Sequence, residues 1–225
     1  MAKRKSVVAD TSRVISFPAS KRKAPGRIKI ANAVKKLLWE KSYSHITWGE
    51  IARTAGVSEA LIYQHFGDRE GLLCGVIGEL LEEYILAQRQ ALQGTYGALN
   101  KLRRLIWSHL NQYNQDRVFA KILLLEIRGI PRFFESEAYQ VIQEYGTIIL
   151  EIIKEGVYNH EIRDDVQPEH IRQVILGTIE HLCMPKIVFN REFSSDELTD
   201  EACRIIFPGI QAAGPADSPK KSGKK

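Results

Sequence analysis

The chain of 225 residues is long enough for one small and one larger domain, and its 44% hydrophobic residues suffice for a buried core. No apolar run approaches the about 20 residues that a membrane-spanning helix needs, and no apolar stretch follows the basic N-terminus as a secretory signal requires. We therefore expect a cytoplasmic protein with no membrane contact.

Positive charge is concentrated at the two ends of the chain. Residues 1–26 hold seven Lys/Arg against one acid, a net charge of +6, and residues 212–225 hold four against one, a net charge of +3. Residues 27–72 carry +2 and residues 73–211 carry −6. A polyanion such as DNA should therefore approach the N-terminal side of the protein.

Both ends have the composition of disordered segments. Residues 1–26 contain two basic clusters and two prolines, and we expect a disordered basic arm. Such an arm either contacts phosphates or the minor groove of DNA, or only keeps the protein soluble, and the sequence favours neither. Residues 212–225 are expected to form a disordered, solvated basic tail.

The first predicted helix covers residues 27–42. Its apolar residues recur with the spacing of one helical face, as in an amphipathic helix that packs on a core. They are Ile30, Ala31, Val34, Leu37 and Leu38.

Residues 47–66 predict two short helices joined by a tight turn. Thr47 can cap the first helix, and Glu50 stands three residues later, the spacing of a capping box. Gly56 falls where that helix must end, because glycine adopts a positive φ at little steric cost. Ser58 can then cap the second helix, which runs through Phe66. This is how a helix-turn-helix DNA-binding motif is built, although any corner between two helices has a similar pattern.

The start of the second helix would contact base edges in the major groove. Gln can form two hydrogen bonds with adenine, Glu can accept one from cytosine, and Ala or Leu can contact the thymine methyl group. The candidates for base contact are Glu59, Ala60, Leu61 and Gln64.

The arrangement over residues 27–75 resembles the TetR family of bacterial transcriptional regulators. The residues that carry the resemblance are Ile51-Ala52, Ala55-Gly56-Val57-Ser58, Ile62-Tyr63, His65-Phe66 and Arg69-Glu70-Gly71-Leu72. The resemblance implies an all-α protein with a three-helix helix-turn-helix DNA-binding domain over residues 27–73. A larger helical domain for ligand binding and dimerisation would follow over residues 74–211. It further implies that the partners are double-stranded operator DNA, a small-molecule effector and a second copy of the chain.

In the family, several positions of the DNA-binding domain commonly contact DNA phosphates. Hydroxyl, phenol, imidazole and guanidinium groups can all donate hydrogen bonds to phosphate oxygens. The corresponding residues here are Thr47, Tyr63, His65 and Arg69, and we also assign Trp48 to contact with the DNA backbone. Arg69 stands where the family more often has lysine, so the contact geometry can differ.

The rest of the chain predicts only helices, over residues 69–93, 98–114, 116–129, 135–159, 168–190 and 195–211. Gly71, Gly75 and Gly78 lie near the start of the first of these, where each costs about 1 kcal/mol relative to alanine. They either soften the helix or permit close helix packing, and we favour packing. Pro185 should kink its helix or end it near Leu182.

A ligand pocket needs apolar walls with a few polar groups. Residues 123–134 combine apolar positions with isolated charges, and our candidate lining residues are Trp107, Glu126, Arg128, Phe133 and Phe134. Glu126 and Arg128 can equally face solvent. Residues 149–163 and 177–182 resemble the ligand domains of TetR members that respond to fatty acyl-CoA thioesters.

The last two helices are expected to pair across a two-fold axis as a four-helix bundle, which matches the family. The candidate interface residues are Ile171, Val174, Ile175, Thr178, Ile179, Leu182, Leu198, Ala202 and Ile205. Some of these apolar residues must also serve the core of a single chain.

Enzyme, cofactor and metal sites find no support in the sequence. The six histidines are scattered, and there is no HExxH motif, glycine-rich phosphate loop or GxSxG motif. The three cysteines, Cys74, Cys183 and Cys203, are too far apart for a disulfide framework or a metal site, so we expect reduced thiols.

We conclude from the sequence that this is a homodimeric DNA-binding transcriptional regulator, a repressor released from a pseudo-palindromic operator by a small apolar or amphipathic ligand. The alternative is an architectural or scaffolding DNA-binding protein on the same fold that acts through a protein partner.

Overall fold

The computed structural model describes residues 24–212, and within them the secondary structure is helical apart from one isolated bridge between Ile162 and Gln211. The all-α prediction is confirmed for this part of the chain. The predicted basic arm and tail lie almost entirely outside it. In chain order the elements are α1 (Pro25–Glu40), η1 (Tyr43–His45), α2 (Trp48–Ala55), α3 (Glu59–Phe66), α4 (Arg69–Leu92), α5 (Ala98–Gln115), α6 (Arg117–Lys121), η2 (Ile122–Glu126), η3 (Ile127–Gly129), η4 (Pro131–Glu135), α7 (Glu137–Tyr158), α8 (Pro168–Val188) and α9 (Ser195–Ile210).

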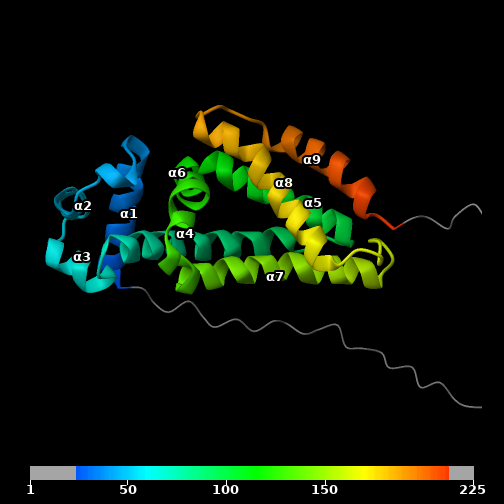
Figure 1. Ribbon diagram of the computed structural model, residues 1–225, viewed down its shortest axis with the longest axis horizontal. Coiled ribbons are helices and arrows are strands. Elements are labelled where there is room, and N and C mark those ends of the chain that lie inside the picture. Colours follow the sequence, from blue (N-terminus) through cyan, green and yellow to red (C-terminus); the bar gives the residue numbers. More distant parts are fainter. Residues whose placement is uncertain (1–23, 213–225) are drawn as a thin grey trace, which may run out of the picture.

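Helices α1, α2 and α3 form a small unit at one end of the molecule, which we call the reader (Figure 1). Helix α1 begins at Pro25, two residues earlier than predicted, because proline fits the first turn of a helix, where its missing N–H is not needed. Its five predicted apolar residues are all buried, as an amphipathic helix requires.

Helices α4 to α9 form the larger unit, which we call the body. Helix α4 runs from the reader into the body, where it lies along α7 (Figure 1). Helix α5 packs on α9, and α7 packs on α8. Five of the predicted body helices are found with ends that differ from the prediction by at most two residues.

The predicted helix over residues 116–129 is not a regular α-helix. Asp116 caps α6 by accepting a hydrogen bond from the Phe119 N–H at 3.0 Å, but the chain widens into a π-helical turn, η2, and then tightens into the 3₁₀ turn η3. Ile122, Leu123 and Leu124 are all buried, and three successive residues cannot share one narrow face of an α-helix. Packing on several sides therefore overrides the regular helical geometry.

Pro185 does not end helix α8, which continues to Val188. Pro185 lacks an N–H for the carbonyl of residue 181, and both residues are exposed. Water can satisfy that carbonyl. Of the two predicted outcomes, an end near Leu182 is wrong, and a kink at Pro185 stays a prediction.

The glycines at the start of α4 permit close packing. A Cβ on Gly75 would lie 2.5 Å from the Phe66 ring, and one on Gly71 would overlap the Phe66 carbonyl oxygen. At Gly78 a Cβ would stand 3.4 Å from the Cβ of Ala138 in α7. The favoured interpretation is confirmed at Gly71 and Gly75, where a larger residue would push α3 away from α4.

Over residues 24–212, none of the helices combines the length and the apolar character that crossing a membrane requires.

Candidate nucleic-acid interface

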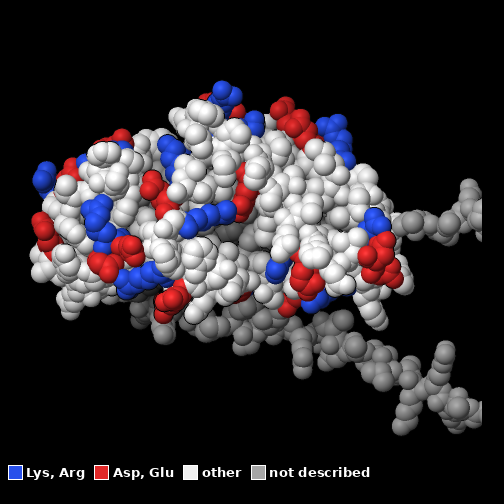
Figure 2. Space-filling view, viewed as in Figure 1, with Lys and Arg blue, Asp and Glu red and all other residues white. Residues whose placement is uncertain are grey.

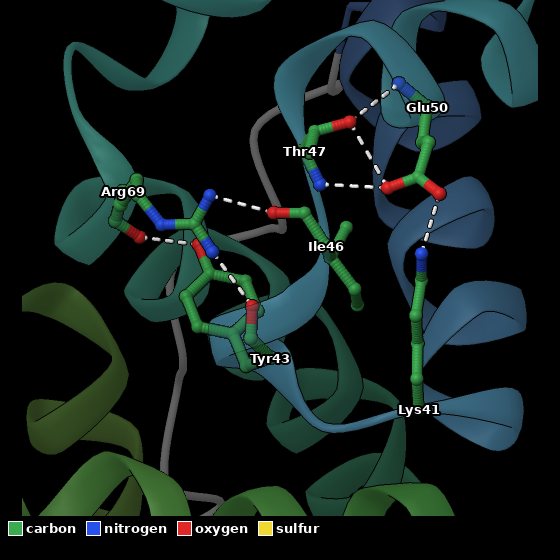
Figure 3. Close-up of polar contacts among 6 residues, drawn as sticks. All are labelled: Lys41, Tyr43, Ile46, Thr47, Glu50 and Arg69. Atoms are coloured by element: carbon green, nitrogen blue, oxygen red, sulfur yellow. Dashed lines mark hydrogen bonds and ion pairs between the residues drawn. The ribbon is translucent and has the colours of Figure 1, made fainter.

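The start of α2 is fixed by the predicted capping box. The Thr47 hydroxyl accepts a hydrogen bond from the Glu50 N–H at 3.3 Å, and Glu50 Oε2 accepts one from the Thr47 N–H at 2.9 Å (Figure 3). Lys41, just after α1, donates to Glu50 Oε1 at 2.5 Å. Glu50 therefore joins the end of α1 to the start of α2.

These contacts hold Glu50 ionised. The Lys41 ammonium group, followed by the two donors of Thr47, lowers the pKa of the Glu50 carboxyl from 4.5 to about 2. The carboxylate also lies at a helix N-terminus, where negative charge is favourable.

The turn between α2 and α3 has the predicted geometry. Gly56 has a φ of 65°, in the left-handed region that favours glycine. The Ser58 hydroxyl accepts a hydrogen bond from the Leu61 N–H at 3.2 Å and caps α3. Local chemistry thus sets the relation between the two helices.

Arg69 joins the start of α4 to the chain before α2. Its guanidinium group donates to the carbonyls of Ile46 at 2.7 Å and Tyr43 at 2.6 Å, and lies 4.8 Å from the centre of the Tyr43 ring (Figure 3). The Tyr43 hydroxyl donates in return to the Arg69 carbonyl at 2.5 Å. The side chain predicted to contact phosphate therefore has two acceptors inside the reader, and its first role is to hold the reader together.

The outer face of the reader carries an aromatic pair. Trp48 of α2 and Tyr63 of α3 stack with ring centres 4.9 Å apart, and Tyr63 is 55% exposed. Ala60 and Gln64 of α3 are also exposed, as is Thr47. These five residues can therefore meet a DNA groove without rearrangement of the protein.

The other predicted contact residues of α3 lie against neighbouring helices. His65 and Leu61 are half-buried beside Gly26 of α1, where a Cβ would lie 3.0 Å from His65 Nε2. The Glu59 carboxylate lies against Gly49 of α2, where a Cβ would stand 3.2 Å away. Phosphate or base contact by these three residues stays a prediction.

Sequence reasoning missed Arg53. It is exposed in the last turn of α2, immediately before the turn that leads to α3. A lone arginine on a helix is usually an ordinary solvent-facing residue, so nothing in its sequence context singles it out.

The five predicted ligand-pocket residues do not converge on one site. The Trp107 indole N–H donates to Asp196 at 2.7 Å, Arg128 pairs with Glu180 of α8 at 2.5 Å, and Glu126 lines a cleft of about 210 Å³ between α1 and η2. Phe133 is buried, whereas Phe134 is 50% exposed. Residues adjacent in sequence point in different directions, since this segment changes its helical hydrogen-bonding pattern.

Sequence reasoning also missed a buried polar cluster inside the body. It lies among α4, α5 and α7 and contains Tyr84, Gln88, His109, Tyr113 and Tyr145, none more than 6% exposed. In the sequence, His109 is only one of six scattered histidines. Only the packing of three separate helices brings the members together.

The expected dimer residues divide into two groups. Ile171, Ile175, Ile179, Leu198 and Ala202 are buried within one chain, so the expectation that they contact a second copy is corrected. These residues pack α8 and α9 on each other and on the remaining helices of the body. Val174 and Ile205 are 54% and 70% exposed, and Thr178 and Leu182 are half-buried.

Over residues 24–212, no group of three or more His, Cys, Asp or Glu side chains could hold a metal ion. Cys74, Cys183 and Cys203 are free and buried, as expected for reduced thiols.

Two family descriptions match the chain. Residues 30–74 match bacterial regulatory proteins of the tetR family, and residues 77–209 match the C-terminal region of YsiA-like protein. The second match alone covers more than half of the chain.

Two curated relatives are regulators. The fatty acid metabolism regulator protein of Bacillus subtilis (strain 168) is 24% identical over 190 residues, which is 84% of this chain and 98% of the relative. The HTH-type transcriptional regulator HbdR of Aromatoleum sp. (strain CIB) is 32% identical over 83 residues, which is 37% of this chain and 36% of that protein.

Solved structures share the fold. The transcriptional regulator FadR of Bacillus subtilis in complex with stearoyl-CoA superposes with a TM-score of 0.74 at 23% identity, covering 82% of this chain and 99% of that chain. The fatty acid degradation regulator FadR of Bacillus halodurans has a TM-score of 0.75 at 21% identity, covering 83% and 97%.

Proposed function

The chain belongs to the TetR family of bacterial regulatory proteins and is a transcriptional regulator, and we propose that it is a repressor that binds a pseudo-palindromic operator as a homodimer. We further propose that a fatty acyl-CoA thioester releases it from DNA.

The exposed face of α3 is the observation that carries the operator proposal. Tyr63 and Gln64 are exposed on a helix that is held at both ends, by the Ser58 cap at its start and by the packing of Phe66 against Gly75 of α4 at its end. A rigid support is what sequence-specific contacts need, because the side chains must meet base edges in one geometry.

Dimerisation is supported by the outer faces of α8 and α9. Val174 and Val188 of α8 and Ile205 of α9 are large apolar residues with 45–70% exposure. On the face of the molecule that Figure 2 shows, few charged side chains lie over the middle of α8. The two helices pack on each other, and both lie remote from α2 and α3 (Figure 1). A contact between two copies here would leave both readers free for successive half-sites.

The effector proposal rests on the likeness to regulators of fatty acid metabolism, one of them solved with stearoyl-CoA. To release DNA, the thioester must bind more tightly to a conformer whose readers no longer fit the operator. A coupling of about 1–3 kcal/mol is typical of such regulation. We place the protein in the cytoplasm, where both DNA and acyl-CoA are found.

The deciding experiment measures fluorescence anisotropy of DNA from upstream of the protein's own gene, at near-physiological salt, with random duplex as control. We expect at least about a 10³-fold preference for the specific DNA, and release by stearoyl-CoA but not by free CoA. Equal, steeply salt-dependent binding to both duplexes would contradict the proposal and favour the architectural alternative. A variant lacking residues 1–23 measures how much of that binding comes from the arm.

The dimer is tested separately by light scattering of Val174→Glu and Ile205→Glu. Leu86→Glu in α4 is the matched control, because Leu86 is also apolar and 59% exposed. We expect the first two variants to be monomers and the control to remain a dimer.

A further inference from the structure

The buried polar cluster of the body is closely packed. His109 of α5 lies at its centre. The centre of its ring is 4.6 Å from the ring centre of Tyr113, 5.7 Å from that of Tyr84 and 5.6 Å from that of Tyr145. Gln88 lies one helical turn beyond Tyr84 on α4. Aromatic rings and hydrogen-bonding groups thus meet where three helices of the body pack together.

Only part of the cluster's hydrogen-bonding capacity is used. His109 Nδ1 bonds the Tyr145 hydroxyl at 3.1 Å, and the Gln88 amide donates to the Ser108 hydroxyl at 2.7 Å. The Tyr84 and Tyr113 hydroxyls, His109 Nε2 and Gln88 Oε1 are buried without a partner. A polar network that served only to stiffen a core would be expected to have all its members bonded, because each unpaired buried group weakens the fold.

The cluster is electrically neutral. Burial lowers the pKa of His109 to about 3, and burial raises the pKa of Tyr113 well above its ordinary value. The charges of Glu180 and Arg128 also act on Tyr113, but these two side chains pair with each other. A neutral ligand group is therefore favoured here, since a buried charge would lack a counter-charge.

Three of these four unpartnered atoms, on Gln88, Tyr113 and His109, together suit one kind of ligand group. Gln88 Oε1 can only accept a hydrogen bond, whereas the Tyr113 hydroxyl can donate or accept. His109 Nε2 donates or accepts according to the tautomer. A hydroxyl group both donates and accepts, so it suits all three atoms, while a carbonyl cannot satisfy Gln88.

We propose that His109, Tyr113 and Gln88 bind a hydroxyl group carried on the apolar part of the effector, so that the protein prefers hydroxylated acyl chains to unsubstituted ones. This inference rests on the proposed acyl-CoA response and adds its selectivity.

The first test needs no ligand. Tyr113→Phe removes an unpartnered hydroxyl, so its melting temperature should equal or exceed that of the wild type. Tyr145→Phe is the matched control, because its hydroxyl bonds His109, and its melting temperature should fall. A fall of several degrees in Tyr113→Phe would mean that its hydroxyl is already paired, and would overturn the proposal.

The second test compares stearoyl-CoA with a series of hydroxystearoyl-CoA thioesters that carry the hydroxyl at different positions. Binding is followed both by the rise in melting temperature and by release of DNA. We expect at least one hydroxylated thioester to bind about tenfold more tightly than stearoyl-CoA. Tyr113→Phe should abolish this preference, so that the variant binds the hydroxylated thioester no more tightly than it binds stearoyl-CoA. Tyr158→Phe, at a position 84% exposed, should keep the preference.

The outcomes separate this inference from the proposed function. If stearoyl-CoA binds and releases DNA but no hydroxylated thioester binds more tightly, the inference is wrong and the proposed function stands. A preference that survives in Tyr113→Phe also overturns it. If no thioester binds at all, both the effector class and the inference are wrong.

Discussion

The reader and the body use polar groups in opposite ways. In the reader and at its junction with α4, Glu50 and Arg69 each bond two partners and Tyr43 bonds Arg69, and these contacts link α1, α2 and α4. In the body, His109 and Tyr113 are buried in the core and keep unpartnered atoms. A unit that must present one surface to DNA gains from rigidity, whereas a unit that must admit a ligand can keep groups that only the ligand completes.

A large effect should come from acid acting on the body. Because burial lowers the pKa of His109 from 6.5 to about 3, the unfolded chain binds more protons over this interval, and stability falls as the pH drops below 6.5. Urea unfolding at pH 7.5 and pH 5 measures the loss, with His109→Gln as control. If the variant shows the same loss, the imidazole is not its source.

In the reader, Arg69→Ala should lower the free energy of unfolding by about 3 kcal/mol, because two carbonyls lose a charged donor. Two exposed arginines serve as controls in chemical denaturation. Arg53→Ala should change stability by less than about 0.5 kcal/mol. Arg128→Ala, which breaks an exposed ion pair of the body, should cost at most about 1 kcal/mol. A large loss in Arg128→Ala would weaken the contrast between the two units.

The contacts that distinguish one DNA sequence from another should come from the reader. Gln64→Ala should weaken operator binding by about 1–3 kcal/mol, with little change for random duplex, if Gln64 contacts a base. Gln140→Ala on an exposed position of α7 should leave both affinities unchanged. Anisotropy titrations with the two duplexes measure this, and an equal loss on both would assign Gln64 to the phosphate backbone.

Tyrosine hydroxyls should differ between the two units. Tyr43→Phe removes the hydrogen bond to the Arg69 carbonyl and should cost about 1 kcal/mol of unfolding free energy. Tyr113→Phe, by contrast, should cost nothing. Denaturation of both variants under one condition measures the difference, and equal losses would contradict the contrast.

The smallest effect should be the acid response of Glu50. Because its folded pKa of about 2 lies below 4.5, its stabilising contribution is complete above pH 4.5 and is lost as the pH falls toward 2. The carboxylate is accessible to solvent, so salt should reduce the effect. Melting curves of Glu50→Gln and wild type should converge across this interval, and a constant gap would rule out the carboxylate charge.

The helix caps and the turn of the reader could be predicted from the sequence alone. Thr47, Glu50, Gly56 and Ser58 act on backbone groups within three or four residues, so their spacing alone predicts the caps and the turn. The helical character of the body follows from local periodicity in the same way.

Contacts between side chains of different helices could not be predicted from the sequence and are known only from the folded structure. Residues four apart on α8, such as Ile171 and Ile175, proved to be core, whereas Val174 on the same helix faces outward. Arg69 meets the carbonyl of Tyr43, which lies 26 residues away, and His109 meets Tyr145, 36 residues away. Such contacts depend on how separate helices pack, and the periodicity of each helix shows that it has an apolar face but not what covers that face.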